Sequence, residues 1–170
     1  MRARELFWVL TKTAIFTALV PFTVGFWLPT RVHWAYAPPT YRQSYVLWQL
    51  VLGRLLFIAG AAISLWCAWD FSVQGLGTPA PIDAPKKLVV NGLYRYVRNP
   101  MYAGVFFLVA SRAVIFRSFP IVVYLALVAI CVNLFILFYE EPHLRKVFGE
   151  PYLHYGRRVP RWIPRFRPMP

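Results

Sequence analysis

The chain has 170 residues, enough for one domain. Hydrophobic residues make up 59% and charged residues only 15%, which is too apolar a balance for a soluble domain of this size. The formal charge of +13 does not indicate a nucleic-acid partner, because the basic residues flank apolar runs and form no single stripe. Composition therefore predicts an integral membrane protein.

Four apolar stretches are long enough to cross the hydrocarbon core of a bilayer, which takes about 20 residues. They cover residues 7–28, 47–69, 100–119 and 120–139. The first could pass for a signal peptide, but it lacks an evident small-residue cleavage site and further spans follow, so we expect a retained helix. The predicted fold is all-α, a single polytopic membrane domain over residues 1–170 with about four transmembrane helices.

The last two stretches touch at Ser118, Phe119 and Pro120. So short a connection predicts a tight antiparallel hairpin, with one long helix kinked at Pro120 as the alternative. In a hairpin, the start of the third span lies beside the end of the fourth. Residues near 98 and near 140 are then neighbours.

The basic residues predict the orientation. With four spans, both termini share one side with the segments 70–99 and 140–170. Thirteen of the 19 lysines and arginines lie on that side, and only Arg31, Arg42 and Arg117 lie on the other. The positive-inside rule places the basic side, with both termini, in the cytoplasm. The C-terminal run VPRWIPRFRPMP also predicts contact with the anionic lipid of that leaflet.

The segment before the third span ends in a helix start. Asn91 and Gly92 indicate a turn, and Asn99 followed by Pro100 is typical of an N-cap and first helical position. The free N–H groups of this terminus form an anion site, which Arg98 would reinforce.

The fourth span runs into an acidic motif. Because a residue that precedes proline avoids helical geometry, we expect a bend near Glu141. A short helix should follow as far as Phe148, with Gly149 as its C-cap. Glu140 and Glu141 would then lie at the cytoplasmic mouth of the bundle, facing Arg98. This cluster suits a small zwitterionic or cationic ligand, although an interfacial ion pair is an equal alternative.

Two motifs carry a resemblance to a known family: GLYRYVRNPMYAG and EEPHLRKVFGEPYLHYGRRVPRWIP. Together they resemble the isoprenylcysteine carboxyl methyltransferase and phospholipid methyltransferase group of integral membrane enzymes, over residues 75–164. The resemblance implies S-adenosylmethionine as cofactor, held by segments 70–99 and 140–170. The cofactor residues that it implies are Tyr94, Arg98, Asn99, Pro100, Tyr102, Glu140, Glu141, Leu144, Tyr152 and Tyr155, with Arg161 in support.

The implied reaction is methyl transfer to a lipophilic acceptor, which could be a carboxylate, an amine or a thiol. A carboxylate needs little acid–base chemistry, whereas an amine or thiol must lose a proton, with Glu140 or Glu141 as the candidate base. Arg98, Glu140 and Glu141 are therefore the candidate catalytic residues. Many relatives have histidine in place of Asn99, so a role for an imidazole there is absent.

Other polar residues are weaker candidates. Arg54, Arg112 and Asn133 lie within the predicted spans, where they either stabilise helix packing or line the acceptor cavity. The three histidines match no metal-binding spacing, and His143 and His154 are expected to be surface residues, so we expect no metal site.

Two other functions compete with methyl transfer. One is a nicotinamide-dependent membrane reductase of the sterol or enone type, in which the C-terminal part has a similar arrangement of arginine, tyrosine and proline. Against it, this chain has no glycine-rich dinucleotide loop. A non-catalytic membrane scaffold would not explain why Arg98 and the two glutamates meet. The sequence does not indicate the oligomeric state.

Overall fold

The computed structural model describes residues 3–38, 40, 44–75 and 87–169, and this part of the chain contains helices and no strand. The helical elements, in chain order, are α1 (Ala3–Phe22), η1 (Thr23–Trp27), α2 (Leu28–Tyr36), α3 (Leu47–Asp70), η2 (Phe71–Gly75), η3 (Gly92–Arg95), α4 (Pro100–Phe116), α5 (Phe119–Phe135), η4 (Ile136–Glu140), α6 (Glu141–Phe148) and α7 (Glu150–Arg158). The all-α prediction is confirmed. Residues 76–86 of the predicted segment 70–99 lie outside the described residues.

Three continuous helices are long and apolar enough to cross a membrane: Phe7–Tyr36, Leu47–Val73 and Phe119–Phe148. The apolar helix α4 has 17 residues, about 25 Å at 1.5 Å per residue, which is at the short end for a span. Large apolar side chains such as Leu47, Ile58 and Leu65 point outward. An apolar exterior of this kind is stable in lipid, so the chain is a polytopic integral membrane protein.

The first helix is longer than expected. The predicted span ends at residue 28, whereas the helix continues through the π-helical turn η1 to Tyr36. Pro21 and Pro29 flank this turn. The wider hydrogen-bond spacing of a π-turn accommodates such interruptions, and the chain therefore bends without leaving the helix.

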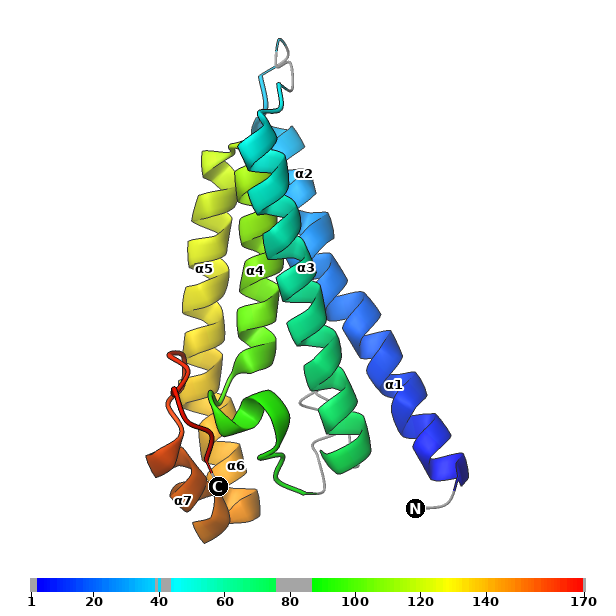
Figure 1. Cartoon of the computed structure of the whole chain (residues 1–170), viewed down its shortest axis with the longest axis vertical. Helices are drawn as coiled ribbons and strands as arrows, with labels where there is room; N and C mark the ends of the chain where they lie inside the picture. The colour runs from blue at the N-terminus through cyan, green and yellow to red at the C-terminus, as the bar shows by residue number, and fades with distance from the viewer. Residues whose placement is uncertain (1–2, 39, 41–43, 76–86, 170) are drawn as a thin grey trace.

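Helices α4 and α5 form the predicted antiparallel hairpin, and the alternative of one helix kinked at Pro120 is wrong (Figure 1). Arg117, with a φ of 48°, ends α4 in the left-handed conformation, and Ser118 is extended. Pro120 then lies in the first turn of α5, where its missing N–H costs nothing. Two residues suffice to reverse the chain.

Helices α3 and α4 approach most closely where glycines face each other. A Cβ atom on Gly60 would lie 2.6 Å from the carbonyl oxygen of Gly104, and a Cβ on Gly104 would lie 2.6 Å from Oγ of Ser64. Small residues at such contacts let helix backbones pack closely in a membrane.

Gly60→Ala is expected to lower the free energy of unfolding by about 1–3 kcal/mol, because the added methyl group forces the two helix backbones apart. Equilibrium unfolding in mixed micelles measures this. Ala59→Val adds more volume one residue away, on an exposed position, and should leave the stability unchanged. Equal stability of the Gly60 variant and wild type would contradict the tight contact.

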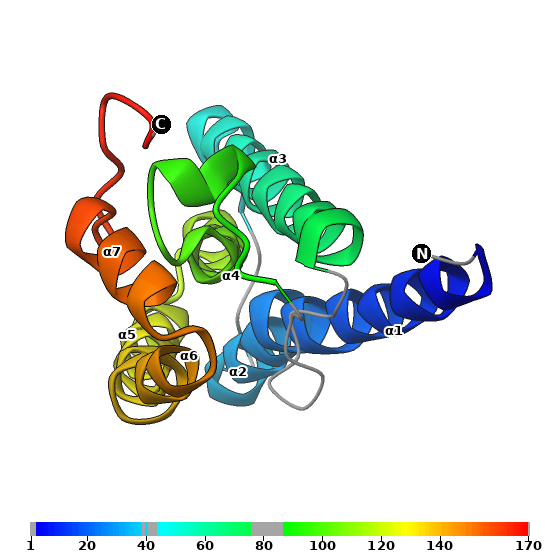
Figure 2. The ribbon, with the colours of Figure 1, turned by 90° about the horizontal axis from the view of Figure 1, so that it is seen from below.

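One end of the bundle carries the polar segments. Figure 2 shows α6, α7 and the η3 turn gathered around the end of α4, while α1 runs away from them. The start of α1 and the C-terminal segment lie at this same end (Figure 1). The hairpin thus brings the two motifs of the sequence to one place.

Candidate active site

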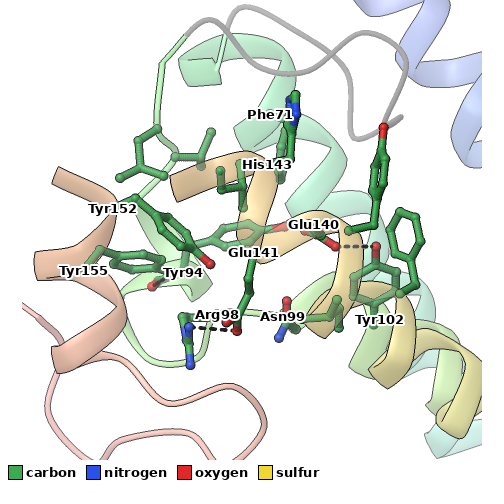
Figure 3. Close-up of a pocket in the computed structure, with 16 residues that line it drawn as sticks. Phe71, Tyr94, Arg98, Asn99, Tyr102, Glu140, Glu141, His143, Tyr152 and Tyr155 are labelled. Carbon is green, nitrogen blue, oxygen red and sulfur yellow. Dashed lines mark hydrogen bonds and ion pairs between the residues drawn. The ribbon is translucent and has the colours of Figure 1, made fainter. Parts of the chain in front are cut away.

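An ion pair joins the two motifs. Nη1 of Arg98 lies 3.0 Å from Oε1 of Glu141, although 43 residues separate them (Figure 3). The side chains are only 13% and 4% exposed. The hairpin geometry predicted from the short connection at Ser118 therefore places Arg98 beside the acidic pair.

Glu141 is held by three arginines. Besides Arg98, Nε and Nη2 of Arg161 donate to its two oxygens at 2.6 and 3.0 Å, and Nη2 of Arg145 donates to Oε2 at 3.1 Å. Bidentate guanidinium–carboxylate pairing is among the strongest polar contacts in proteins. One carboxylate among three guanidinium groups leaves an excess of positive charge, and it fastens three separate segments together. Glu141 thus holds the site in shape.

Glu140 has a different environment. Its Oε2 accepts a hydrogen bond from the hydroxyl of Tyr102 at 2.8 Å (Figure 3). In the described part of the chain it forms no ion pair with a basic side chain. Although they are adjacent in sequence, the two glutamates have different partners: Glu141 pairs with arginines and Glu140 with a tyrosine hydroxyl.

A π-helical turn ends at Glu140, directly before Glu141. The expectation that Glu141 avoids helical geometry is wrong, because Glu141 has φ −62° and ψ −43° and η4 leads directly into α6. The π-turn Ile136–Glu140 lies immediately before the Glu141–Pro142 step and takes up the distortion that proline imposes. C-terminal to it, α6 ends at Phe148 with Gly149 as its cap, as predicted.

A cavity lies between these residues (Figure 3), and we call it the polar cavity because Arg98, Glu140 and Glu141 line it. It is lined by Phe71, Leu88, Val89, Tyr94, Arg98, Asn99, Tyr102, Phe135, Ile136, Tyr139, Glu140, Glu141, His143, Leu144, Tyr152 and Tyr155. Nine of the ten residues that the resemblance assigns to the cofactor are among them, and Pro100 is the exception. His143, expected at the surface, lines the cavity as well. His143 follows Glu140 by three residues, and residues with this spacing lie on the same face of a helix, so the sequence indicated that both could face the cavity.

Asn99 occupies the N-cap position of α4 as predicted, but its side chain does not cap the helix. Its Nδ2 donates instead to the carbonyl oxygen of Arg161 at 3.3 Å. The first N–H groups of α4 therefore keep their capacity to bind an anion at the cavity.

Tyrosines form one wall of the polar cavity. The hydroxyl of Tyr155 donates to the carbonyl oxygen of Tyr94 at 2.8 Å. Burial raises the pKa of Tyr94, of Tyr152 and of Tyr155, so all three phenols are neutral at physiological pH. Neutral aromatic rings attract cations through their faces.

A second, apolar cavity of about 360 Å³ adjoins the first. Its walls come from α1 and η1 on one side and from α4 and α5 on the other; they are Phe16, Val20, Pro21, Val24, Phe71, Tyr94, Arg98, Asn99, Met101, Tyr102, Val105, Phe106, Val128, Val132, Phe135 and Glu140. Seven residues line both cavities, Tyr102 and Glu140 among them. The sequence predicted an acceptor cavity but not the residues that line this one, since hydrophobic runs do not show where two helices leave space between them.

Arg54, Arg112 and Asn133 line neither cavity, so their predicted place in the substrate cavity is not supported. Arg54 is exposed on α3. The guanidinium of Arg112 lies 3.6 Å from the ring centroid of Phe26, and Oδ1 of Asn133 accepts from Nε1 of Trp162 at 3.2 Å. Depth within a span does not tell which face of the helix a side chain occupies. The described residues contain no group of three or more potential metal ligands.

Comparison with known proteins gives similarity to two kinds of methyltransferase. Phosphatidylethanolamine N-methyltransferases of Aspergillus clavatus and Aspergillus flavus are 39% and 37% identical over 72 and 73 residues, which is 39% and 40% of this chain and 7% of each relative. Protein-S-isoprenylcysteine O-methyltransferase B of Arabidopsis thaliana is 32% identical over 83 residues, 46% of this chain and 40% of that protein.

The chain thus spans less than half the length of these relatives. No solved structure matches it. The family model for phospholipid methyltransferases matches residues 48–151, which contain the first motif and residues 140–151 of the second. That match covers more than half of the chain, and the chain therefore belongs to the phospholipid methyltransferase family.

Proposed function

We propose that this protein transfers a methyl group from S-adenosylmethionine to a lipophilic amine at the cytoplasmic face of the membrane. The observation that carries the proposal is the meeting of a polar and an apolar cavity at Tyr102 and Glu140. Family membership supports methyl transfer to a lipid-type acceptor over the reductase and scaffold alternatives. The basic end of the bundle, by the positive-inside rule, is the cytoplasmic one.

The residues around the polar cavity fit the chemistry of the cofactor. Arg98 lines the cavity and, with the uncapped start of α4, suits the carboxylate of the cofactor. The tyrosine faces and Glu140 suit its cationic groups. When bound, S-adenosylmethionine supplies an activated methyl group on a sulfonium. The site has about 100 Å³ of free space, less than the 300–1,000 Å³ that is typical of ligand pockets.

Binding therefore requires side chains at the rim to move. Tyr139 and His143 are exposed, and their rings stack in parallel, with centroids 6.1 Å apart. Exposed side chains change rotamer readily and at low cost when a ligand binds. These two residues are the part of the lining that we expect to swing outward.

Glu140 favours an amine among the three acceptors. A carboxylate or a thiolate at the junction of the cavities would face the negative charge of Glu140. An ammonium group is attracted there. Tyr102 binds one oxygen of Glu140, so the other oxygen is available to accept the proton that the amine must lose before it attacks. The apolar walls exclude water from the reacting groups.

The test follows a labelled methyl group. Wild-type protein in lipid nanodiscs, incubated with trideuteromethyl S-adenosylmethionine and a membrane lipid extract, should give label on amine headgroups by mass spectrometry. Val128→Phe places a ring in the apolar cavity and should lower kcat/KM for the acceptor at least about tenfold, with unchanged cofactor affinity. Val123→Phe on the exposed side of α5 is the matched control and should behave as wild type.

Two results would contradict parts of the proposal separately. Label found as carboxyl methyl ester would remove the amine assignment and keep the methyltransferase. Absence of both cofactor binding and label transfer, in protein that unfolds cooperatively, would remove the methyltransferase itself.

A further inference from the structure

The C-terminal segment after α7 is fastened to both motifs. Val159 is almost fully buried, and the backbone N–H of Arg98 donates to the carbonyl oxygen of Pro160 at 2.9 Å. Arg161 then pairs with Glu141. Further along, the N–H groups of Arg165 and Met169 donate to the carbonyl oxygens of Tyr96 and Arg95 at 3.0 Å. The segment is therefore ordered along its length.

Between these attachments the chain lies beside the membrane-spanning helices. Nε1 of Trp162 donates to Asn133 in α5, and its ring centroid lies 5.6 Å from that of Phe106 in α4. Phe106 lies six residues after Pro100 and Asn133 lies seven residues before Glu140, which is about 10 Å along each helix axis. Figure 1 shows the red segment at the level of the lower turns of α5. Trp162 therefore lies where the apolar part of the two helices meets the polar end of the bundle.

The surface of this segment is apolar and cationic. Ile163 is 79% exposed and Phe166 is fully exposed. Exposed Arg167 follows Phe166, and no acidic residue occurs from 151 to 170. Exposed large apolar side chains among arginines are the signature of a peripheral lipid contact, in which the rings enter the acyl boundary and the guanidinium groups bind anionic headgroups.

We propose that residues 162–167 form a membrane anchor that inserts Ile163 and Phe166 into the surface of an anionic bilayer. A lipid surface is favoured over a protein partner because Trp162 packs against Asn133 of α5 and Phe106 of α4, two apolar helices whose next residues, Leu134 and Phe107, are exposed. The anchor begins directly after Arg161, so lipid contact also stabilises the Arg161–Glu141 pair. The proposal does not depend on methyl transfer.

The experiment measures the depth of the anchor. A nitroxide is attached through Pro164→Cys on a Cys131→Ser background, since Cys67 is buried. Collision rates with oxygen and with an aqueous nickel complex are compared in nanodiscs of phosphatidylcholine and of an equal mixture with phosphatidylglycerol. The label should be shielded from nickel in the anionic discs, whereas a label at His154→Cys, exposed on α7, should stay in water.

Variants separate the charge from the apolar contact. Arg167→Gln should shift the equilibrium toward the aqueous position about fivefold in the anionic discs, and Phe166→Asn at least about tenfold. Arg117→Gln removes the same charge at the opposite end and should have no effect. The thermal midpoint of wild type should be higher in anionic than in neutral discs.

Three outcomes overturn the proposal. One is a label at residue 164 that is equally accessible to nickel in both lipids. Another is shielding that appears in detergent and grows with protein concentration, which would assign the surface to a second copy of the chain. The third is a thermal midpoint that does not depend on anionic lipid.

Discussion

Glu141→Gln is expected to lower the free energy of unfolding by about 3 kcal/mol or more and to abolish cofactor binding. The substitution leaves Arg98, Arg145 and Arg161 around a neutral amide. Removing one partner of a buried ion pair is strongly destabilising, because the remaining charge has no compensation. Such a removal costs about 3–5 kcal/mol. We expect a loss near the lower value, because Arg145 and Arg161 are 54% and 37% exposed and water screens their charges.

Equilibrium unfolding in mixed micelles gives the stability, and calorimetric titration with S-adenosylmethionine gives the affinity. Glu150→Gln removes the same charge from an exposed position on α7 and should match wild type in both. Arg145→Gln, at the most exposed of the three arginines, should cost less than about 1 kcal/mol. If Glu141→Gln were as stable as wild type, the three contacts would not hold the segments together.

Glu140→Gln is expected to leave the fold intact and to lower kcat for methyl transfer to an amine by about 10²–10⁴-fold. Glutamine can still accept the hydrogen bond of Tyr102 through its amide oxygen, so no buried group loses its partner. It cannot take a proton from the acceptor, and the loss of a general base has this magnitude. Single-turnover rates with a lipophilic amine and cofactor affinity, measured on the same preparation, separate chemistry from binding.

Tyr102→Phe tests the same site with a smaller expected effect. It removes the hydrogen bond that orients Glu140 and keeps the carboxylate, so its rate should fall by about tenfold at most. A Glu140→Gln protein with the wild-type rate would show that the acceptor needs no base, as a carboxylate acceptor would not. If Glu141→Gln protein were folded but inactive while Glu140→Gln protein stayed active, Glu141 would be the general base and Glu140 would not.

The sequence does not distinguish the roles of Glu140 and Glu141. From the sequence, Glu140 and Glu141 are equivalent, since both follow the fourth span and both face the motif that contains Arg98. In the structure, Arg161 and Arg145 complete the partners of Glu141, while Tyr102 is the partner of Glu140. Glu140 is the last residue of a π-helical turn and Glu141 is the first residue of α6, and such a change in helix type leaves little trace in residue type.

What the sequence determined by itself is local or follows from chain length. Runs of about 20 apolar residues specify spans, Asn99 with Pro100 specifies a helix start, and Gly149 specifies a helix end, because each depends on a few neighbouring residues. The two-residue connection before α5 makes α4 and α5 antiparallel, and Arg98 at the start of α4 therefore lies beside the acidic motif that follows α5. Most of the polar cavity could therefore be predicted.

Only the tertiary structure decided the rest. The apolar cavity lies between α1 and η1 on one side and α4 and α5 on the other, and Arg54 and Arg112 do not line it. The place of Trp162 against Asn133 depends on a tail that folds back along the bundle. These features arise from how separate helices pack, and hydrophobic packing lacks the directionality that would record them in a local pattern of residues.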